Sequence, residues 1–137
     1  MSETRRNFES FALPLLRIGG SSLMMIHGFS KLEMLLNDEK IEFYNFMGLG
    51  DEVSLILAVI GELLAPLLLV IGLKTRLAAL IAAVTMAVAA FGAHAGDGIE
   101  DREHSLIYLI LFLSLVFSGA GKWSVDEFLS RKKNPKK

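Results

Sequence analysis

The sequence predicts an all-α membrane protein in which four transmembrane helices form a single domain, with a short interfacial helix in the first external loop. The chain has 137 residues, of which 53% are hydrophobic, and its mean hydropathy of +0.49 lies outside the range of ordinary soluble domains. Four apolar runs, at about residues 11–30, 53–73, 77–96 and 104–121, each approach the roughly 20 residues that a helix needs to cross a bilayer. These runs occupy most of the chain, so no separate soluble domain is expected.

The first run is expected to be an uncleaved helix with one polar face. Residues 4–8 loosely resemble a twin-arginine leader, but Arg17 interrupts the apolar core and no small-residue cleavage site follows. At about 100° per residue, one stripe roughly 80° wide holds Arg17, Gly20, Met24, His27 and Lys31. We expect this face to point into the bundle.

The second run carries Glu62 as its single charge, near the middle of the bilayer. An ionisable group at that depth costs roughly 2.5 to 3.5 kcal/mol on insertion scales, so it is expected to face a partner, a cavity or a substrate. Burial favours a neutral, protonated carboxyl as its resting form. Pro66 follows four residues later and lacks an N–H, so the Glu62 carbonyl also loses its usual helical hydrogen bond.

The third run is rich in alanine. Ala79, Ala83 and Ala87 form a small-xxx-small ridge, which lets helix backbones approach closely and makes a homodimer plausible. Arg76 and His94 are eighteen residues apart, about five helical turns, so both lie on one side of this helix.

The connecting segments complete the element order. The interfacial helix of the first loop is predicted from its apolar and aromatic residues, Ile41, Phe43, Tyr44, Phe46 and Met47. The fourth run is opened by Glu103 and His104.

The distribution of basic residues predicts the topology. One side of the predicted bundle holds Arg5, Arg6, Lys74, Arg76, Arg131, Lys132, Lys133, Lys136 and Lys137, whereas the other holds Lys31, Lys40 and Arg102 within acidic loops. The positive-inside rule therefore predicts a multi-pass protein of a bacterial inner membrane with both termini in the cytoplasm. The chain has no cysteine, which excludes disulfides and thiolate chemistry, and its net charge of -1 does not suggest a nucleic-acid partner.

On this topology the unusual polar residues gather in the outer half of the bundle. A buried acid beside a base that titrates near neutrality suits proton-coupled chemistry at a quinone headgroup, so Glu62 and His27 are the candidate catalytic residues. Ligand contacts are expected from Arg17, Met24, Lys31, Arg76, His94 and Glu103. Lys31 or Arg17 would hold the carboxylate or the reduced ring by charge.

Several other interpretations stay open at this point. Lys31 and Arg76 could simply reach the headgroup region, and the polar residues could form an internal network in a non-enzymatic scaffold or small transporter. Haem between His27 and His94 is not expected, because three histidines without repeated spacing are thin evidence for ligation. Metal binding by His94, Asp97, Glu103 and His104 is not expected either, since acidic loops are more often solvated.

Three segments together resemble the DoxX family of small bacterial membrane proteins. They are RIGGSSLMMIHGFSKL at residues 17–32, Gly61-Glu62 with Pro66 followed by LLVIGLKTR at residues 68–76, and GAGKWSVD at residues 119–126. Glu103 stands at the acidic position that opens the fourth helix in that family. The resemblance implies a four-helix membrane fold and an association with respiratory or redox partner subunits, because members are linked to quinone-reactive oxidoreductases and to a complex for oxidative-stress defence.

Overall fold

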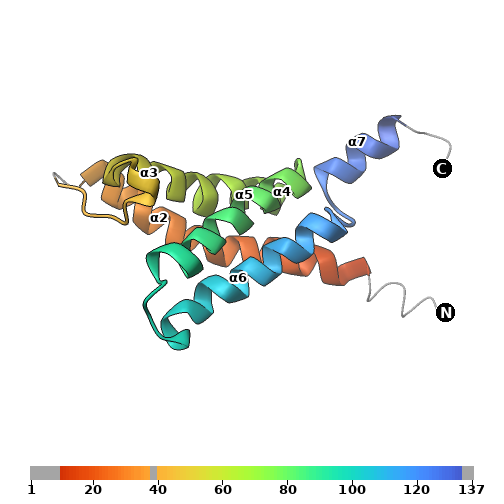
Figure 1. The fold of residues 1–137 in the computed structure, drawn as a ribbon. Coiled ribbons are helices and arrows are strands. Elements are labelled where there is room, and N and C mark those ends of the chain that lie inside the picture. Colours follow the sequence, from red (N-terminus) through yellow and green to blue (C-terminus); the bar gives the residue numbers. More distant parts are fainter. Residues whose placement is uncertain (1–9, 38–39, 134–137) are drawn as a thin grey trace.

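The computed structural model describes residues 10–37 and 40–133, and over these residues it consists of helices joined by turns and loops, with no strand. Four long helices follow one another and a shorter one ends the chain (Figure 1). The first long helix combines residues 10–15, η1 (Leu16–Gly20) and α2 (Ser21–Asn37). The second combines α3 (Asp51–Val59), η3 (Ile60–Leu64) and α4 (Ala65–Ile71), and the third combines α5 (Thr75–Val88) and η4 (Ala89–Ala93). The fourth long helix is α6 (Ile99–Ser118), and the shorter helix is α7 (Val125–Lys133). The predicted all-α architecture is confirmed.

The second and third long helices are long and apolar enough to cross a membrane. They run over Asp51–Ile71 and Thr75–Ala93, close to the predicted runs. The fourth begins at Ile99, five residues earlier than predicted, because Gly98 has an extended backbone and two acidic residues, Glu100 and Asp101, fill the first turn. Negative charge stabilises a helix N-terminus, so the largely polar residues 99–103 that precede the predicted start are helical as well.

The first loop differs from the predicted interfacial helix. Between residues 40 and 50 the structure has only the 3-10 turn η2 (Phe46–Gly48), in which Met47 has a φ of 52°. Side chains at the start of α3 hold the loop instead: the Phe46 N–H donates to Ser54 Oγ at 2.9 Å, and the Phe43 N–H donates to Asp51 Oδ2 at 3.4 Å. These bonds draw the backbone onto α3 and compete with a local helix.

Two residues of the alanine ridge lie inside the protein, and the third, Ala87, is half-buried. Ala79 and Ala83 are buried in a core with Phe112 and Leu115 of α6, and α5 makes its most extensive contact with α6. Small side chains allow this close approach of the two helices. A dimer would therefore need a different surface.

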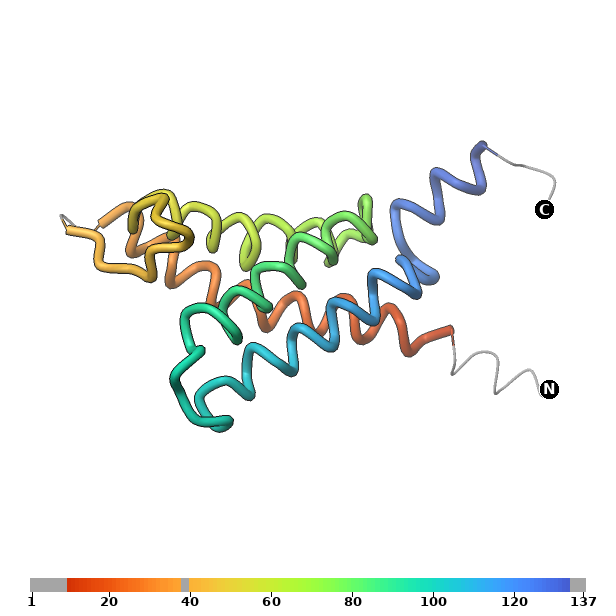
Figure 2. The backbone as a smooth tube through the Cα atoms, in the orientation of Figure 1, coloured from red at the N-terminus to blue at the C-terminus, as the bar shows by residue number. Residues whose placement is uncertain are grey.

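The bundle is closed at one end and split at the other. At the closed end α4 packs against α2 and α5, and η1 packs against α6. Toward the other end α5 still contacts η3 but scarcely contacts α3, and α6 scarcely contacts α2. Figures 1 and 2 show the result as two arms, one made of α2, α3 and the first loop, the other of α5, η4 and the start of α6. We call these the upper and lower arms.

Candidate functional site

A cavity of about 830 Å³ lies between the two arms. Its walls are largely apolar, and they come from α2, the first loop, the second long helix, the third long helix and α6. A set of polar side chains also lines it: His27, Lys31, Tyr44, Ser54, Glu62, Thr85, His94, His104 and Ser105. A mostly apolar cavity of this size with a few convergent polar groups is typical of a small-molecule site.

Glu62 lies in the middle of the π-helix η3. The Ala65 N–H donates to the Ile60 carbonyl, five residues back, and Pro66 has no N–H with which to continue a regular α-helix. This wide turn presents the Glu62 side chain to the cavity, where its carboxylate Oε2 lies 2.6 Å from Lys31 Nζ of α2. The side chains are 7% and 24% exposed, so this ion pair is shielded from water. Glu62 therefore has the kind of partner that its position in an apolar run predicts.

Two glycines bring neighbouring helices close to Glu62. A Cβ on Gly28 of α2 would touch the Glu62 carbonyl oxygen and would lie 2.6 Å from the carbonyl carbon. A Cβ on Gly61 would lie 2.5 Å from Thr85 Cβ of α5. Both contacts require glycine, so the backbone around Glu62 is held between the first and third long helices. The carbonyl that Pro66 releases therefore faces Gly28.

The histidines of the cavity come from different helices. The rings of His27 on α2 and His104 on α6 meet edge to face, with centroids 4.4 Å apart, and His104 also meets Tyr108 at 4.9 Å. His94 follows η4 and its Nδ1 lies 2.7 Å from Asp97 Oδ2. The two histidines considered as haem ligands, His27 and His94, thus contact different partners.

The structure sorts the sequence-predicted site residues into two groups. Met24, His27, Lys31, Glu62 and His94 all line the cavity. Arg17, Arg76 and Glu103 do not, and Glu103 is exposed at the start of α6. Within residues 10–37 and 40–133, no group of three or more histidine or acidic side chains could hold a metal ion.

His104 lines the cavity, although the sequence indicated it only at the start of the fourth run and in a metal site that is not expected. The sequence did contain a pattern that could have indicated His104. Tyr108 lies four residues later, about one helical turn, so both polar rings lie on the same face of the helix. The contact with His27 could not be read from spacing, since it depends on how α2 and α6 cross.

Arg17 lies at the closed end and is completely buried. Its guanidinium Nη1 donates to the Leu69 and Val70 carbonyls at 2.7 and 2.9 Å, and Nη2 donates to the Trp123 carbonyl at 2.9 Å. The first two acceptors are at the C-terminus of α4, where a positive charge is favourable. Arg17 therefore ties the first helix to α4 and to the segment before α7, away from Glu62.

Asp126 performs the matching role at the start of α5. Its two carboxylate oxygens accept hydrogen bonds from the Lys74 and Thr75 N–H groups, both at 2.8 Å. Burial opposes ionisation of Asp126, but these hydrogen bonds and the positive charge of Arg17 outweigh it and lower the pKa of the carboxyl. Residues 17, 74–75 and 126 thus form a closed-end clamp built on opposite helix termini.

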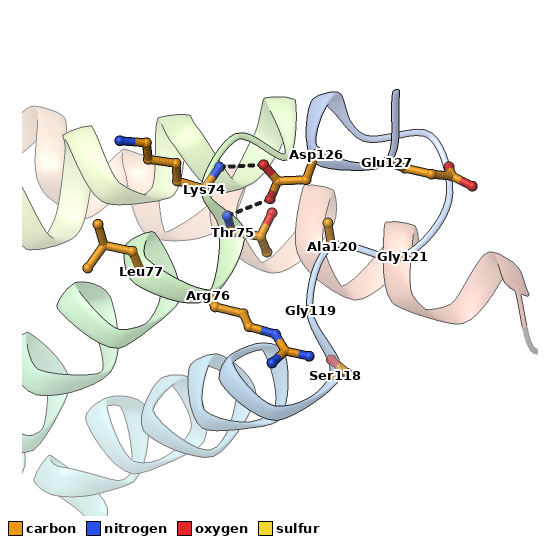
Figure 3. A pocket seen from close by; sticks show the side chains of 10 residues that line it. All are labelled: Lys74, Thr75, Arg76, Leu77, Ser118, Gly119, Ala120, Gly121, Asp126 and Glu127. Carbon is orange, nitrogen blue, oxygen red and sulfur yellow. Dashed lines mark hydrogen bonds between the residues drawn. The ribbon is translucent and has the colours of Figure 1, made fainter. Parts of the chain in front are cut away.

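Arg76 lines a more open hollow of about 550 Å³ beside this clamp. Figure 3 shows its side chain extending toward Ser118 and Gly119, with the Asp126 bonds on the other side. Gly119, Gly121 and Gly72 have positive φ values, which lets the chain turn tightly here. Arg76 and Glu62 are therefore parts of separate regions.

Known proteins resemble this chain over most of its length. The DoxX family model matches residues 12–95. An uncharacterized protein of Haemophilus influenzae is 35% identical over 137 aligned positions, which cover 91% of this chain and 96% of the relative. A second uncharacterized protein of that organism is 35% identical over 75 positions, which cover 52% of this chain and 50% of the relative. No solved structure matches significantly. The matches extend over more than half of the chain, and the chain is a membrane protein of the DoxX family.

Proposed function

We propose that this protein crosses a bacterial cytoplasmic membrane four times and binds a quinone in the cavity between its arms, as a subunit or accessory of a membrane redox system. The observation that carries the proposal is the Glu62–Lys31 ion pair inside a largely apolar cavity of about 830 Å³. A charged pair at this depth is expensive unless it serves a partner or ligand.

The distribution of charge supports the orientation. The closed end holds Lys74 and Arg76, and the Asp126 bonds bring the start of α7 to the same end. α7 then ends in Arg131, Lys132 and Lys133. The described ends of the chain lie together at this end (Figure 1), as an even number of spans requires. Basic residues favour the cytoplasmic side, so the split end with the cavity faces outward.

The absence of cysteine makes this orientation testable by labelling. Single substitutions Glu100→Cys at the split end and Ser130→Cys in α7 would be treated in intact cells with a membrane-impermeant maleimide. Labelling of the first alone is expected. Labelling of Ser130→Cys alone would show that the orientation is the reverse of the one proposed.

The polar groups suit the proton chemistry of a quinone. Each ring carbonyl accepts a hydrogen bond, which Lys31 or the His27 imidazole would donate. When a quinol is oxidised, its two hydroxyl protons leave as two electrons pass to a partner subunit. The Glu62 carboxylate would accept one of these protons and the His27 imidazole the other, while the Lys31 ammonium, paired with Glu62, would hold the headgroup by charge.

Ligand extraction tests the proposal. Wild type, Glu62→Gln and the control Glu103→Gln would be purified in mild detergent, extracted with organic solvent and analysed by mass spectrometry, with helical content checked by circular dichroism. Glu103 is exposed and outside the cavity, so its variant controls for loss of a carboxylate. Quinone is expected with wild type and Glu103→Gln and is expected to be lost from folded Glu62→Gln. Equal quinone in all three proteins, or none in any, would refute the proposal.

A second candidate is a non-enzymatic scaffold or small transporter. The ion pair itself favours it, because it joins α2 to the second long helix and could serve packing alone. This role predicts that Glu62→Gln lowers the thermal midpoint while the extracted lipids stay unchanged.

A further inference from the structure

We infer that the ligand has a long apolar tail, which enters and leaves the cavity sideways from the lipid, between the second and third long helices. This inference rests on the proposed function and deepens it, because it specifies a tailed amphiphile rather than a free headgroup.

The side opening is defined by residues that both line the cavity and are exposed. On the second long helix these are Leu57 and Ile60, and on α5 they are Leu80, Ile81 and Val84. Their exposed fractions lie between 37% and 55%. A side chain that lines a cavity and also meets the surroundings marks the rim of an opening. All five are aliphatic, so the rim suits acyl chains rather than water.

The opening follows from the helix packing. The second and third long helices pack tightly where Gly61 meets Thr85, since a Cβ on Gly61 would lie only 2.5 Å from Thr85 Cβ. Beyond that contact α5 scarcely touches α3, and the helices diverge toward the split end (Figures 1 and 2). The rim passes across this contact, one residue from Glu62. Leu57 and Ile60 lie on the split-end side of the contact, whereas Leu80, Ile81 and Val84 precede Thr85 on α5 and lie on its closed-end side. A headgroup at the ion pair would have its tail directed through the rim.

Other lining residues are exposed as well, so the cavity also opens toward the aqueous end: they are His27, Tyr44, Ala93 and His104. Phe43, Tyr44 and Phe46 of the first loop also line the cavity. The Tyr44 hydroxyl reaches across to η4, where a Cβ on Gly92 would lie 2.9 Å from it. The loop is held by the Ser54 bond to the Phe46 N–H. A tail that left by this end would pass through headgroups and water, whereas the side opening keeps it in hydrocarbon.

Two quinones with the same ring test the inference, one without a tail and one with a decyl tail. Their affinities would be measured by fluorescence titration of protein in nanodiscs and corrected for partition into the lipid. Val84→Trp narrows the opening, and Leu57→Trp narrows it from the other helix. Ile110→Trp on α6 is the matched control, since Ile110 is 67% exposed and does not line the cavity.

Each rim variant is expected to weaken binding of the tailed quinone by about tenfold, the effect of losing one or two methylene contacts, and to leave the tail-less quinone unchanged. Ile110→Trp is expected to alter neither. A thermal midpoint far below that of wild type identifies a misfolded variant. The other rim variant then provides the test of the side route. The side route would be overturned if wild type bound both quinones with equal corrected affinity and neither rim variant changed these affinities. The quinone site itself would then still stand. Binding of neither quinone by wild type would overturn the quinone site and the inference together.

Discussion

The close contact between Gly28 and the backbone of Glu62 allows a sharp test of the packing around the site. In Gly28→Ala the added Cβ would lie 2.6 Å from the Glu62 carbonyl carbon and 2.8 Å from Leu63 Cβ. Ordinary contact begins at 3.4 Å, so α2 and η3 must separate by about 0.8 Å. The atoms in the way are mainly backbone, which cannot rotate aside.

The expected magnitude follows from two opposing effects. Overpacking a well-packed site costs about 1–3 kcal/mol. Alanine stabilises a helix over glycine by about 0.5–1 kcal/mol, which offsets part of this cost. The free energy of unfolding should therefore fall by about 1–2 kcal/mol, which for a chain of this length corresponds to a thermal midpoint lower by about 5 °C. Lys31 lies one turn from Gly28 on the same helix, so the Lys31–Glu62 ion pair should lengthen as well.

Gly19→Ala is the matched control. Gly19 lies in η1 of the same long helix, and a Cβ there would meet no atom within 4 Å. Its variant should keep or slightly raise the thermal midpoint, measured by circular dichroism in mild detergent. If Gly28→Ala is as stable as Gly19→Ala, the close packing of α2 on Glu62 is wrong.

The closed-end clamp leads to two further predictions. Arg17→Met leaves three carbonyls without their charged donor and should lower the free energy of unfolding by about 3 kcal/mol. Arg76→Met in the open hollow is the control and should change the free energy of unfolding by less than about 0.5 kcal/mol. Equal thermal midpoints for the two variants would contradict the role of Arg17. Asp126→Asn removes the charge from the cap of α5 and should cost about 1 kcal/mol at pH 7. The pKa of Asp126 is lowered in the folded protein, so wild type should be more stable than Asp126→Asn at any pH above the ordinary pKa of 3.8. This difference in stability should disappear as the pH falls through the lower pKa of the folded state. A difference in thermal midpoint between the two proteins that stays constant from pH 7 to pH 3 would show that the charge is not responsible.

The segments that resemble the family divide between these two regions. His27, Lys31 and Glu62 line the cavity. Arg17, the turn at Gly72 and Asp126 belong to the clamp, where the Asp126 N–H also donates to the Gly72 carbonyl at 2.9 Å. We interpret the clamp as the part that fixes the closed end, so that the split end can open a cavity without loss of the bundle.

The sequence alone was sufficient for the four long helices and for the prediction that Glu62 has a partner. Hydrophobic run length reports the burial of each helix, and a charge inside such a run must find a partner whatever the fold. Pro66 likewise acts on its own helix, so the free carbonyl of Glu62 was predictable. These properties are local in the chain.

Tertiary structure decided which of the polar residues meet. Arg17 and Lys31 share one stripe of the first helix, but fourteen residues separate them by about 21 Å along the axis, so they serve opposite ends. His104 meets His27, and Asp126 meets Lys74 and Thr75, because of the way the helices cross. Periodicity determines the face of a helix on which a residue lies, whereas the partner of that face depends on helix crossings that involve residues far apart in the chain.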